Sequence, residues 1–231
     1  MNKFVVTGCG RSGTTYMSEL LSKLDISCTH EKIFPQKIGN LRNYHKLLLL
    51  KFFSFVPWDN GAIGEAAWEA APFIKYLPKN IYIFHQVRHP LEYIKSREAK
   101  GITYFPLRNK YTPNQIITNN DENINNLPIE QKVEYLAKFW IDWNLLVEAN
   151  SFSHSYSRYK MEDINSELIN NILKKINIHM DYHLIEEEIE SFKNKIIHSG
   201  YKKNKLITLN MLTDNTHKKI IELGNRYDYD L

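Results

Sequence analysis

The sequence predicts an α/β fold, a three-layer parallel β-sheet flanked by helices and of the P-loop nucleotide-binding type. Apolar runs rich in β-branched and aromatic residues alternate with stretches of helical pattern, which is typical of a parallel sheet covered on both faces. The expected strands cover residues 4–7, 26–29, 81–87 and 153–159, and the expected helices cover residues 14–23, 65–76, 90–100 and 130–149. A glycine-rich segment between the first strand and the first helix is the second observation, and it predicts the P-loop type.

The glycine-rich segment, residues 8–15, has the composition of a phosphate cradle. Four residues separate Gly8 from Gly13 and two threonines follow, which is the spacing of a nucleotide-binding P-loop. The N–H groups of such a loop and the positive end of the next helix bind an anion without a special side chain. Thr14 stands where an ATPase has its phosphate-binding lysine, and Arg11 is the cation that can replace it. An ordinary glycine-rich turn is the alternative interpretation.

A second phosphate-binding signal follows the expected strand at residues 81–87, where the apolar run ends at Arg88-His89-Pro90. Pro90 suits the first turn of a helix, and that helix carries Ser96. Arg88 and Ser96 are therefore expected near the carboxyl end of the strand, where they can share one phosphate. Taken alone, this spacing is also compatible with a surface salt bridge and an exposed helix face.

Together the two segments resemble the phosphate motifs of the sulfotransferase family, enzymes that use 3′-phosphoadenosine 5′-phosphosulfate as sulfuryl donor. The segment from Arg11 to Thr15 resembles the 5′-phosphosulfate loop, and the segment from Arg88 to Ser96 resembles the 3′-phosphate motif. Weaker landmarks extend the resemblance, which is greatest to bacterial and carbohydrate sulfotransferases, over about residues 3–165. It implies no required metal and the following donor-binding residues: Gly10, Arg11, Ser12, Gly13, Thr14, Thr15, Arg88 and Ser96.

For catalysis, the resemblance points to Arg11 and Glu31. Arg11 is expected to neutralise charge on the leaving phosphate oxygen, and Glu31, directly after the second strand, to take the proton of the acceptor hydroxyl. Proton transfer at neutral pH requires a raised Glu31 pKa, which burial against Trp68 or Phe34 would provide and Arg11 would oppose. His30 is the second candidate for the base because imidazole titrates near neutrality. A helix cap or salt bridge is the alternative role for Glu31.

The acceptor is expected to be a hydroxylated carbohydrate or small metabolite, because the arginine-type loop and Glu31 resemble carbohydrate-modifying and bacterial members. We expect the loops at residues 32–64 and 101–128 to form the acceptor pocket. Within the second loop, residues 109–128 are rich in asparagine and lack apolar periodicity. A lid over the ligands and a plain surface insertion are both compatible with that composition.

Composition predicts a single domain spanning residues 1–231, with a helical and weakly matching part from about residue 166. The chain is 43% hydrophobic and 13% aromatic, which suffices for one core. Its formal net charge of +4 favours anionic ligands but is too small and dispersed for nucleic acid. Only two cysteines occur, Cys9 and Cys28, so a disulfide framework is not expected. We expect a cytoplasmic location instead.

No secretory leader or transmembrane segment is expected. The phosphate loop begins within ten residues of Met1, which leaves no room for a leader. The apolar segment at residues 47–56 is too short to span a bilayer and contains Lys51. It suggests a helix that covers the active-site side or an oligomer contact, with a membrane-surface anchor as the alternative.

Several conspicuous side chains have simpler interpretations. His85, in the middle of a strand, is expected to be a hydrogen-bonded core histidine, and His89 is expected to orient the turn after Arg88. Trp140 and Trp143 are expected in the core, whereas Trp68 could serve as a core anchor or stack on a sugar.

Two other classes of protein are compatible with a phosphate loop. A P-loop kinase or nucleotide hydrolase that has replaced its lysine is one, although such an enzyme should offer a strand-terminal aspartate for magnesium where this chain has Arg88. A non-catalytic nucleotide-binding protein is the other, and it could dispense with Glu31.

Overall fold

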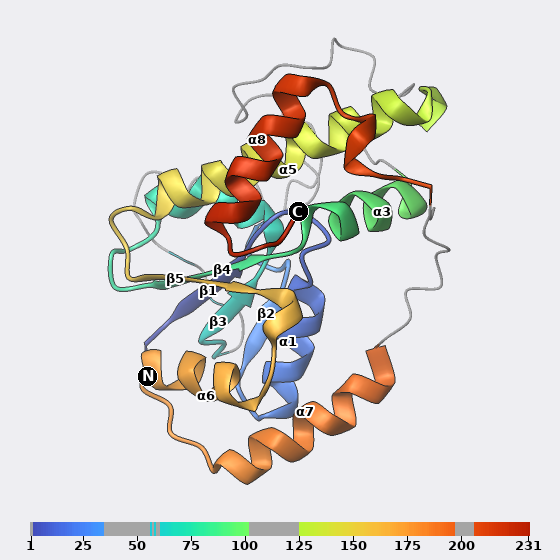
Figure 1. Cartoon of the computed structure of the whole chain (residues 1–231). Coiled ribbons are helices and arrows are strands. Elements are labelled where there is room, and N and C mark those ends of the chain that lie inside the picture. The colour runs from blue at the N-terminus through green and yellow to red at the C-terminus, as the bar shows by residue number, and fades with distance from the viewer. Residues whose placement is uncertain (1, 35–55, 57, 59–60, 102–124, 197–205) are drawn as a thin grey trace.

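The computed structural model describes residues 2–34, 56, 58, 61–101, 125–196 and 206–231 (Figure 1). Its centre is a five-stranded sheet with strand order β2-β3-β1-β4-β5, and every neighbouring pair is parallel. The strands are β1 (Phe4–Thr7), β2 (Cys28–His30), β3 (Gly64–Ala66), β4 (Tyr82–Val87) and β5 (Tyr156–Lys160). The predicted α/β class with a parallel sheet is therefore confirmed.

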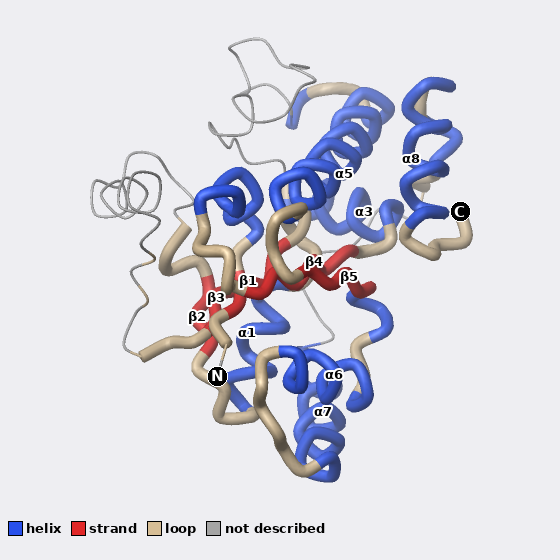
Figure 2. Tube along the Cα trace, turned by 90° about the vertical axis from the view of Figure 1, so that its left-hand side faces the viewer, coloured by secondary structure: helices blue, strands red, loops and turns tan. Residues whose placement is uncertain are grey.

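Helices cover both faces of the sheet, which is seen edge-on between them in Figure 2. On one face lie α1 (Thr14–Lys23), α6 (Ser166–Lys175) and α7 (Tyr182–Ile196). On the other face lie η1 (Trp68–Tyr76), α3 (Pro90–Lys100), α5 (Ile129–Ser151) and α8 (Asp214–Arg226), with short turns η3 (Met161–Asp163) and η4 (Leu209–Met211) completing the described elements. The layers are those of a helix–sheet–helix sandwich.

Each face of the sheet has its own apolar core, because successive side chains of a strand point to opposite faces. In β1, the fully buried Phe4 and Val6 pack with the α1, α6 and α7 helices, whereas Val5 packs with Trp140 and Trp143 of α5. A strand covered on both sides needs apolar residues at every position, which explains the continuous run Phe4–Val6. Trp140 and Trp143 are core residues, as predicted.

Strand β3 differs from the sequence-based expectation, which placed a helix over residues 65–76. Residues 64–66 form a strand, and Trp68–Tyr76 forms 3₁₀ turns with Pro72 inside them. The sequence Gly-Glu-Ala has no β-branched or aromatic residue to indicate a strand. Its glycine is required by packing, since a Cβ at Gly64 would lie 2.1 Å from the Phe4 ring. Tertiary packing has overridden local propensity here.

Three sequence-based predictions fall largely outside the described residues. They concern the apolar segment at residues 47–56, the asparagine-rich loop at residues 109–128 and parts of the two acceptor loops. No helix in the described part of the chain is both long and apolar enough to cross a membrane.

Candidate functional site

The candidate site lies where β1 and β4 end. The chain leaves β1 through α1 toward β2 on one side of the sheet, and leaves β4 through α3 and α5 toward β5 on the other. Connections that diverge from two neighbouring strands leave a crevice at their carboxyl ends, where open α/β sheets bind ligands. The loop at residues 8–13 and Arg88 are the segments that follow these two strands.

The loop after β1 is a tight turn that is stabilised by hydrogen bonds within the loop and from β4. Ser12 donates its N–H to the Cys9 oxygen at 2.8 Å, and the Gln86 side chain donates from Nε2 to the Ser12 oxygen at 2.6 Å. Gly13 has φ 99°, a left-handed conformation that suits glycine, and it precedes α1. A Cβ at Gly13 would lie 2.6 Å from both Gln86 Nε2 and Met161 Sδ. Only glycine fits this position without displacement.

Sequence reasoning missed Gln86, which supports this loop. Gln86 is fully buried in β4 and accepts a hydrogen bond from the Tyr159 hydroxyl at 2.7 Å, so it links β5 to the loop. A Cβ at Gly8 would lie 2.0 Å from the Gln86 main-chain oxygen, which explains the first glycine of the loop. The available signal was a polar residue in a strand buried on both faces.

Arg11, Arg88 and Ser96, predicted from two distant segments, meet at this loop. Arg88 donates from Nη1 to the Arg11 main-chain oxygen at 3.0 Å. Arg11 donates from Nε to the hydroxyl of Ser96 at 3.3 Å, and Ser96 is buried. Arg11 itself has φ 76°, a left-handed conformation uncommon for a side-chain-bearing residue. The guanidinium groups of Arg11 and Arg88, two half-buried residues, therefore meet at the loop after β1, which favours an anionic ligand.

The start of α1 adds polar groups that suit an anion. The Ser12 hydroxyl is buried and has no hydrogen-bond partner within the described residues. Gly13 supplies no side-chain cap to the helix, and the first N–H groups of a helix have no acceptor within it. These N–H groups and the positive end of the helix dipole favour a negatively charged group. The segment from Ser12 to Thr15 therefore offers polar groups whose chemistry suits a phosphate.

His30 connects this loop to Glu31. Its Nε2 lies 3.4 Å from Thr14 Oγ1, 3.2 Å from Thr15 Oγ1 and 3.6 Å from Glu31 Oε1. Burial lowers the His30 pKa, so the neutral imidazole is favoured. The ring is thus placed between the two threonines of the loop and the expected base.

Glu31 sits in a left-handed turn directly after β2. Its φ is 53°, its N–H donates to the Ala66 oxygen at 3.3 Å, and its side chain is 13% exposed. Burial, and then the negative charge of Glu65, raise the Glu31 pKa to about 7, while Lys100 opposes the shift. Burial raises the Glu31 pKa, as the sequence predicted. The cation that lowers this pKa is Lys100, whereas the sequence-based expectation was Arg11. A carboxyl group with this pKa can exchange a proton at neutral pH.

Two further carboxyl groups near Glu31 were missed by sequence reasoning. Glu65 on β3 is fully buried, and its Oε1 accepts the N–H groups of Lys32 and Ile33 at 2.7 and 2.9 Å. Glu69 on η1 is fully buried, and neither of its oxygens has a hydrogen-bond partner within the described residues. Burial, and then Glu31, raise the Glu69 pKa to about 9, so Glu69 is protonated at neutral pH.

The turn after β4 is fixed by residues far along the chain. The Arg88 oxygen accepts the indole N–H of Trp140 at 3.0 Å. Glu162 accepts the N–H of His89 at 2.9 Å through Oε1 and the hydroxyl of Tyr229 at 2.9 Å through Oε2. The His89 ring packs edge-on against Tyr229 at a centroid distance of 5.2 Å. α5, η3 and the C-terminal segment thus set the backbone direction of Arg88.

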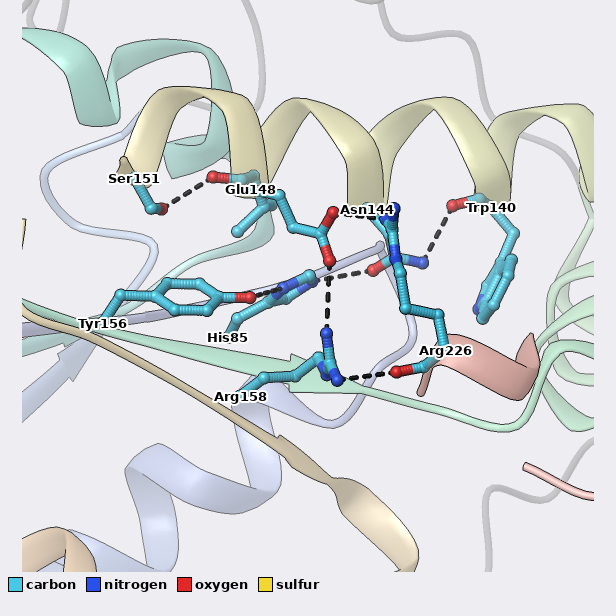
Figure 3. Close-up of polar contacts among 9 residues, drawn as sticks. His85, Trp140, Asn144, Glu148, Ser151, Tyr156, Arg158 and Arg226 are labelled. Atoms are coloured by element: carbon cyan, nitrogen blue, oxygen red, sulfur yellow. Dashed lines mark hydrogen bonds and ion pairs between the residues drawn. The ribbon is translucent and has the colours of Figure 1, made fainter. Parts of the chain in front are cut away.

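His85 is a hydrogen-bonded core residue, as predicted (Figure 3). Its Nε2 lies 2.9 Å from Asn144 Oδ1 and its Nδ1 lies 2.9 Å from the Tyr156 hydroxyl. Because Asn144 uses its amide N–H to donate to the Trp140 oxygen, its Oδ1 accepts from His85 Nε2–H, and Nδ1 accepts from Tyr156. Burial lowers the His85 pKa to about 3.

The contacts of Arg158, Glu148 and Arg226 in Figure 3 attach α8 to the sheet. Arg158 on β5 donates to Glu148 Oε1 at 3.3 Å and to the Arg226 oxygen at 2.8 Å. Arg226 in turn forms an ion pair with Glu148 at 2.5 Å. The Arg158 guanidinium also lies 4.3 Å from the centroid of the Tyr227 ring. These contacts hold in place the C-terminal segment that carries Tyr229.

Trp68, at the edge of the site, is partly buried and packs against the apolar core. Its ring lies 5.2 Å from that of Trp143 and 6.3 Å from that of Phe139 between centroids, and its main-chain oxygen accepts the Trp143 indole N–H at 3.1 Å. A Cβ at Gly10 would lie 3.3 Å from the Trp68 ring, so this glycine lets the loop approach the indole.

Comparison of the chain with protein-family models and with curated protein sequences gives no match. Among the residues described, no group of three or more histidine, cysteine, aspartate or glutamate side chains has an arrangement that could hold a metal ion.

Proposed function

We propose that this chain is a sulfotransferase that moves a sulfuryl group from 3′-phosphoadenosine 5′-phosphosulfate to a hydroxyl group of an acceptor. The observation that carries the proposal is the meeting of Arg11, Arg88 and Ser96 through contacts of 3.0 and 3.3 Å at the end of β1 and β4. The sequence resemblance had assigned these residues to two different phosphates of one nucleotide, and such a ligand requires the two motifs to be neighbours.

The donor would be held by two sets of groups. Arg88 and Ser96 would bind the 3′-phosphate, and the loop from Gly10 to Thr15 would bind the 5′-phosphosulfate through its N–H groups and hydroxyls. The buried Ser12 hydroxyl supports this assignment, because it has no hydrogen-bond partner within the described residues and a bound anion would supply one.

In the reaction, the acceptor oxygen forms a bond to sulfur while the bond between sulfur and the 5′-phosphate oxygen breaks. The electron pair of the broken bond stays on the phosphate oxygen, and Arg11 would neutralise the resulting charge. Glu31 would take the proton of the acceptor hydroxyl, for which its pKa of about 7 is well suited. His30 remains the second candidate because its Nε2 lies 3.6 Å from Glu31 Oε1.

For the acceptor we propose a carbohydrate or another small hydroxylated metabolite, in keeping with the arginine-type loop and Glu31. A cytoplasmic location accompanies this proposal, since the buried Cys9 and Cys28 are not joined in a disulfide bond. Homo-oligomer formation stays a prediction.

The test is transfer of radiolabelled sulfate from the donor to a panel of mono- and oligosaccharides and small alcohols, without metal. Wild-type protein should label at least one acceptor and release an equal amount of adenosine 3′,5′-bisphosphate. Failure to label any acceptor, together with hydrolysis of magnesium ATP, would instead support the nucleotide-hydrolase class.

A further inference from the structure

We propose that Glu65 is a positioning residue that holds the turn carrying Glu31 in the orientation needed for proton transfer. The inference rests on the proposed function of Glu31, but the contacts that support it are independent of any ligand. Glu65 lies on β3, between β2 and β1, and is fully buried. A carboxyl group in the middle of a sheet is costly unless donors surround it.

Within the described residues, hydrogen bonds to Glu65 come from Thr29, Lys32 and Ile33, which lie on both sides of Glu31 in the sequence. Thr29, directly opposite Glu65 in the register of β2 and β3, donates its hydroxyl to Oε2. Lys32 and Ile33 donate their main-chain N–H groups to Oε1 at 2.7 and 2.9 Å. The two main-chain N–H groups can only donate, and the Thr29 hydroxyl, which also lies 3.4 Å from the Gly64 oxygen, makes the third contact. Glu65 therefore ties together the residues before and after the turn.

The turn between these contacts has an unusual conformation. Glu31 adopts φ 53°, and its N–H donates to the Ala66 oxygen at 3.3 Å. A left-handed conformation at a residue with a side chain costs energy and persists where its surroundings fix it. The contacts of Glu65 and Ala66, neighbours on β3, provide that fixation. Loss of the Glu65 carboxylate should therefore release the Glu31 side chain from its present direction.

The charge of Glu65 acts on Glu31 as well. In the part of the chain that the structure describes, the titratable and charged groups that act on Glu31 are His30 on β2, Glu65 on β3, Glu69 on η1 and Lys100 on α3. Of these, Glu65 raises the Glu31 pKa and Lys100 lowers it. A substitution that keeps the hydrogen bonds of Glu65 but removes its charge should therefore lower the Glu31 pKa without moving the turn.

Two variants separate these effects. Glu65→Gln keeps an oxygen for the Lys32 and Ile33 N–H groups and loses the charge, whereas Glu65→Ala loses both. The Glu31 carboxyl pKa is measured by carbon NMR on glutamate-labelled protein, with Glu31→Gln assigning the signal. Turnover is measured as hydrolysis of 3′-phosphoadenosine 5′-phosphosulfate by water. Glu134→Gln is the matched control, because Glu134 also accepts a main-chain N–H, that of Thr213 at 3.0 Å, but on α5.

In Glu65→Gln, the Glu31 pKa and the acidic limb of turnover should both fall by about one pH unit, and neither should move in Glu134→Gln. In Glu65→Ala, turnover should fall roughly 100-fold while affinity for adenosine 3′,5′-bisphosphate is kept. An unchanged Glu31 pKa in Glu65→Gln, or wild-type turnover in Glu65→Ala, would overturn the proposal. If wild-type protein binds no bisphosphate, the proposed function fails, and the NMR measurement still decides the role of Glu65. Should Glu65→Ala not fold, Thr29→Val, which removes one donor, replaces it with a smaller expected loss of turnover.

Discussion

Arg88 donates a hydrogen bond from Nη1 to the main-chain oxygen of Arg11 over 3.0 Å, and so links the loop after β1 to the end of β4. The side chain of the first motif is in turn directed to the helix of the second, since Arg11 Nε contacts the Ser96 hydroxyl. Two hydrogen bonds thus connect the two predicted phosphate motifs. A substitution in one motif is therefore expected to disturb ligand binding at the other.

Replacing Arg88 by alanine should weaken binding of adenosine 3′,5′-bisphosphate by roughly 10- to 100-fold, because a charge-assisted hydrogen bond contributes about 1.5–3 kcal/mol. Isothermal titration calorimetry measures the effect. Lys95→Ala, which removes a positive charge from α3, the helix that follows Arg88, is the control and should change affinity little. Equal losses in both variants would mean that only the general positive potential matters.

Gly13→Ala should destabilise the protein by about 1–3 kcal/mol and abolish bisphosphate binding. A Cβ there would lie 2.6 Å from Gln86 Nε2 and Met161 Sδ, so the loop has to move. Gly61→Ala provides a matched control, since Gly61 also has positive φ, at 77°, but no heavy atom of the described residues lies within 4 Å of the added carbon. Chemical denaturation measures the loss of stability in both variants. The additional loss in Gly13→Ala over Gly61→Ala reports the steric crowding of the added carbon at Gly13.

Glu31→Gln should lower turnover of the donor roughly 10²- to 10⁴-fold while leaving bisphosphate affinity unchanged. Because the Glu31 pKa is about 7 and the base must be deprotonated, kcat/KM of the wild type should rise as pH increases through about 7 and then level off. If Glu31→Gln retained this pH dependence and His30→Gln lost it, His30 would be the base instead of Glu31.

Glu69 predicts a pH dependence of stability. Its pKa is about 9 in the folded protein against an ordinary value of 4.5, so between these pH values the folded protein keeps a proton that the unfolded chain releases. The free energy of unfolding contributed by Glu69 therefore falls as pH rises from about 4.5 to about 9. Glu69→Gln removes this titration, so it should match the wild type near pH 4 and be more stable at pH 8, by on the order of a few kcal/mol.

Urea denaturation at several pH values measures this difference. The exposed Glu167 on α6 serves as the control, and Glu167→Gln should run parallel to the wild type across the pH range. A constant offset between Glu69→Gln and the wild type from pH 4 to pH 8 would show that Glu69 does not titrate in this way.

The sequence was sufficient to predict the parts of the fold in which local pattern and tertiary packing agree. β1 and β4 consist mainly of β-branched and aromatic residues, and α1 and α3 begin at Thr14 and Pro90, as their composition indicates. β3 was missed because its three residues carry no strand signal and are held by their neighbours β2 and β1. Its glycine fits the Phe4 ring, a contact between residues sixty positions apart that no local pattern contains.

The candidate site divides in the same way. Arg11, Arg88 and Ser96 could be predicted from the sequence because the motifs in loops and at strand ends have fixed spacings. Gln86 and Glu65 were not, because a polar residue within an apolar run acquires its role from partners on other strands, here Tyr159 and Thr29. The raised pKa of Glu31 likewise depends on burial and on neighbouring charges, which only the folded chain brings together.

Binding of adenosine 3′,5′-bisphosphate to the wild-type protein, measured by calorimetry without metal and compared with magnesium ATP, tests the proposed donor site most directly. Binding of the bisphosphate in the micromolar range or tighter, with weaker or no binding of magnesium ATP, is the predicted result. Preference for magnesium ATP, or no binding of either nucleotide, would contradict the assignment of Arg11, Arg88 and Ser96 to a sulfuryl donor.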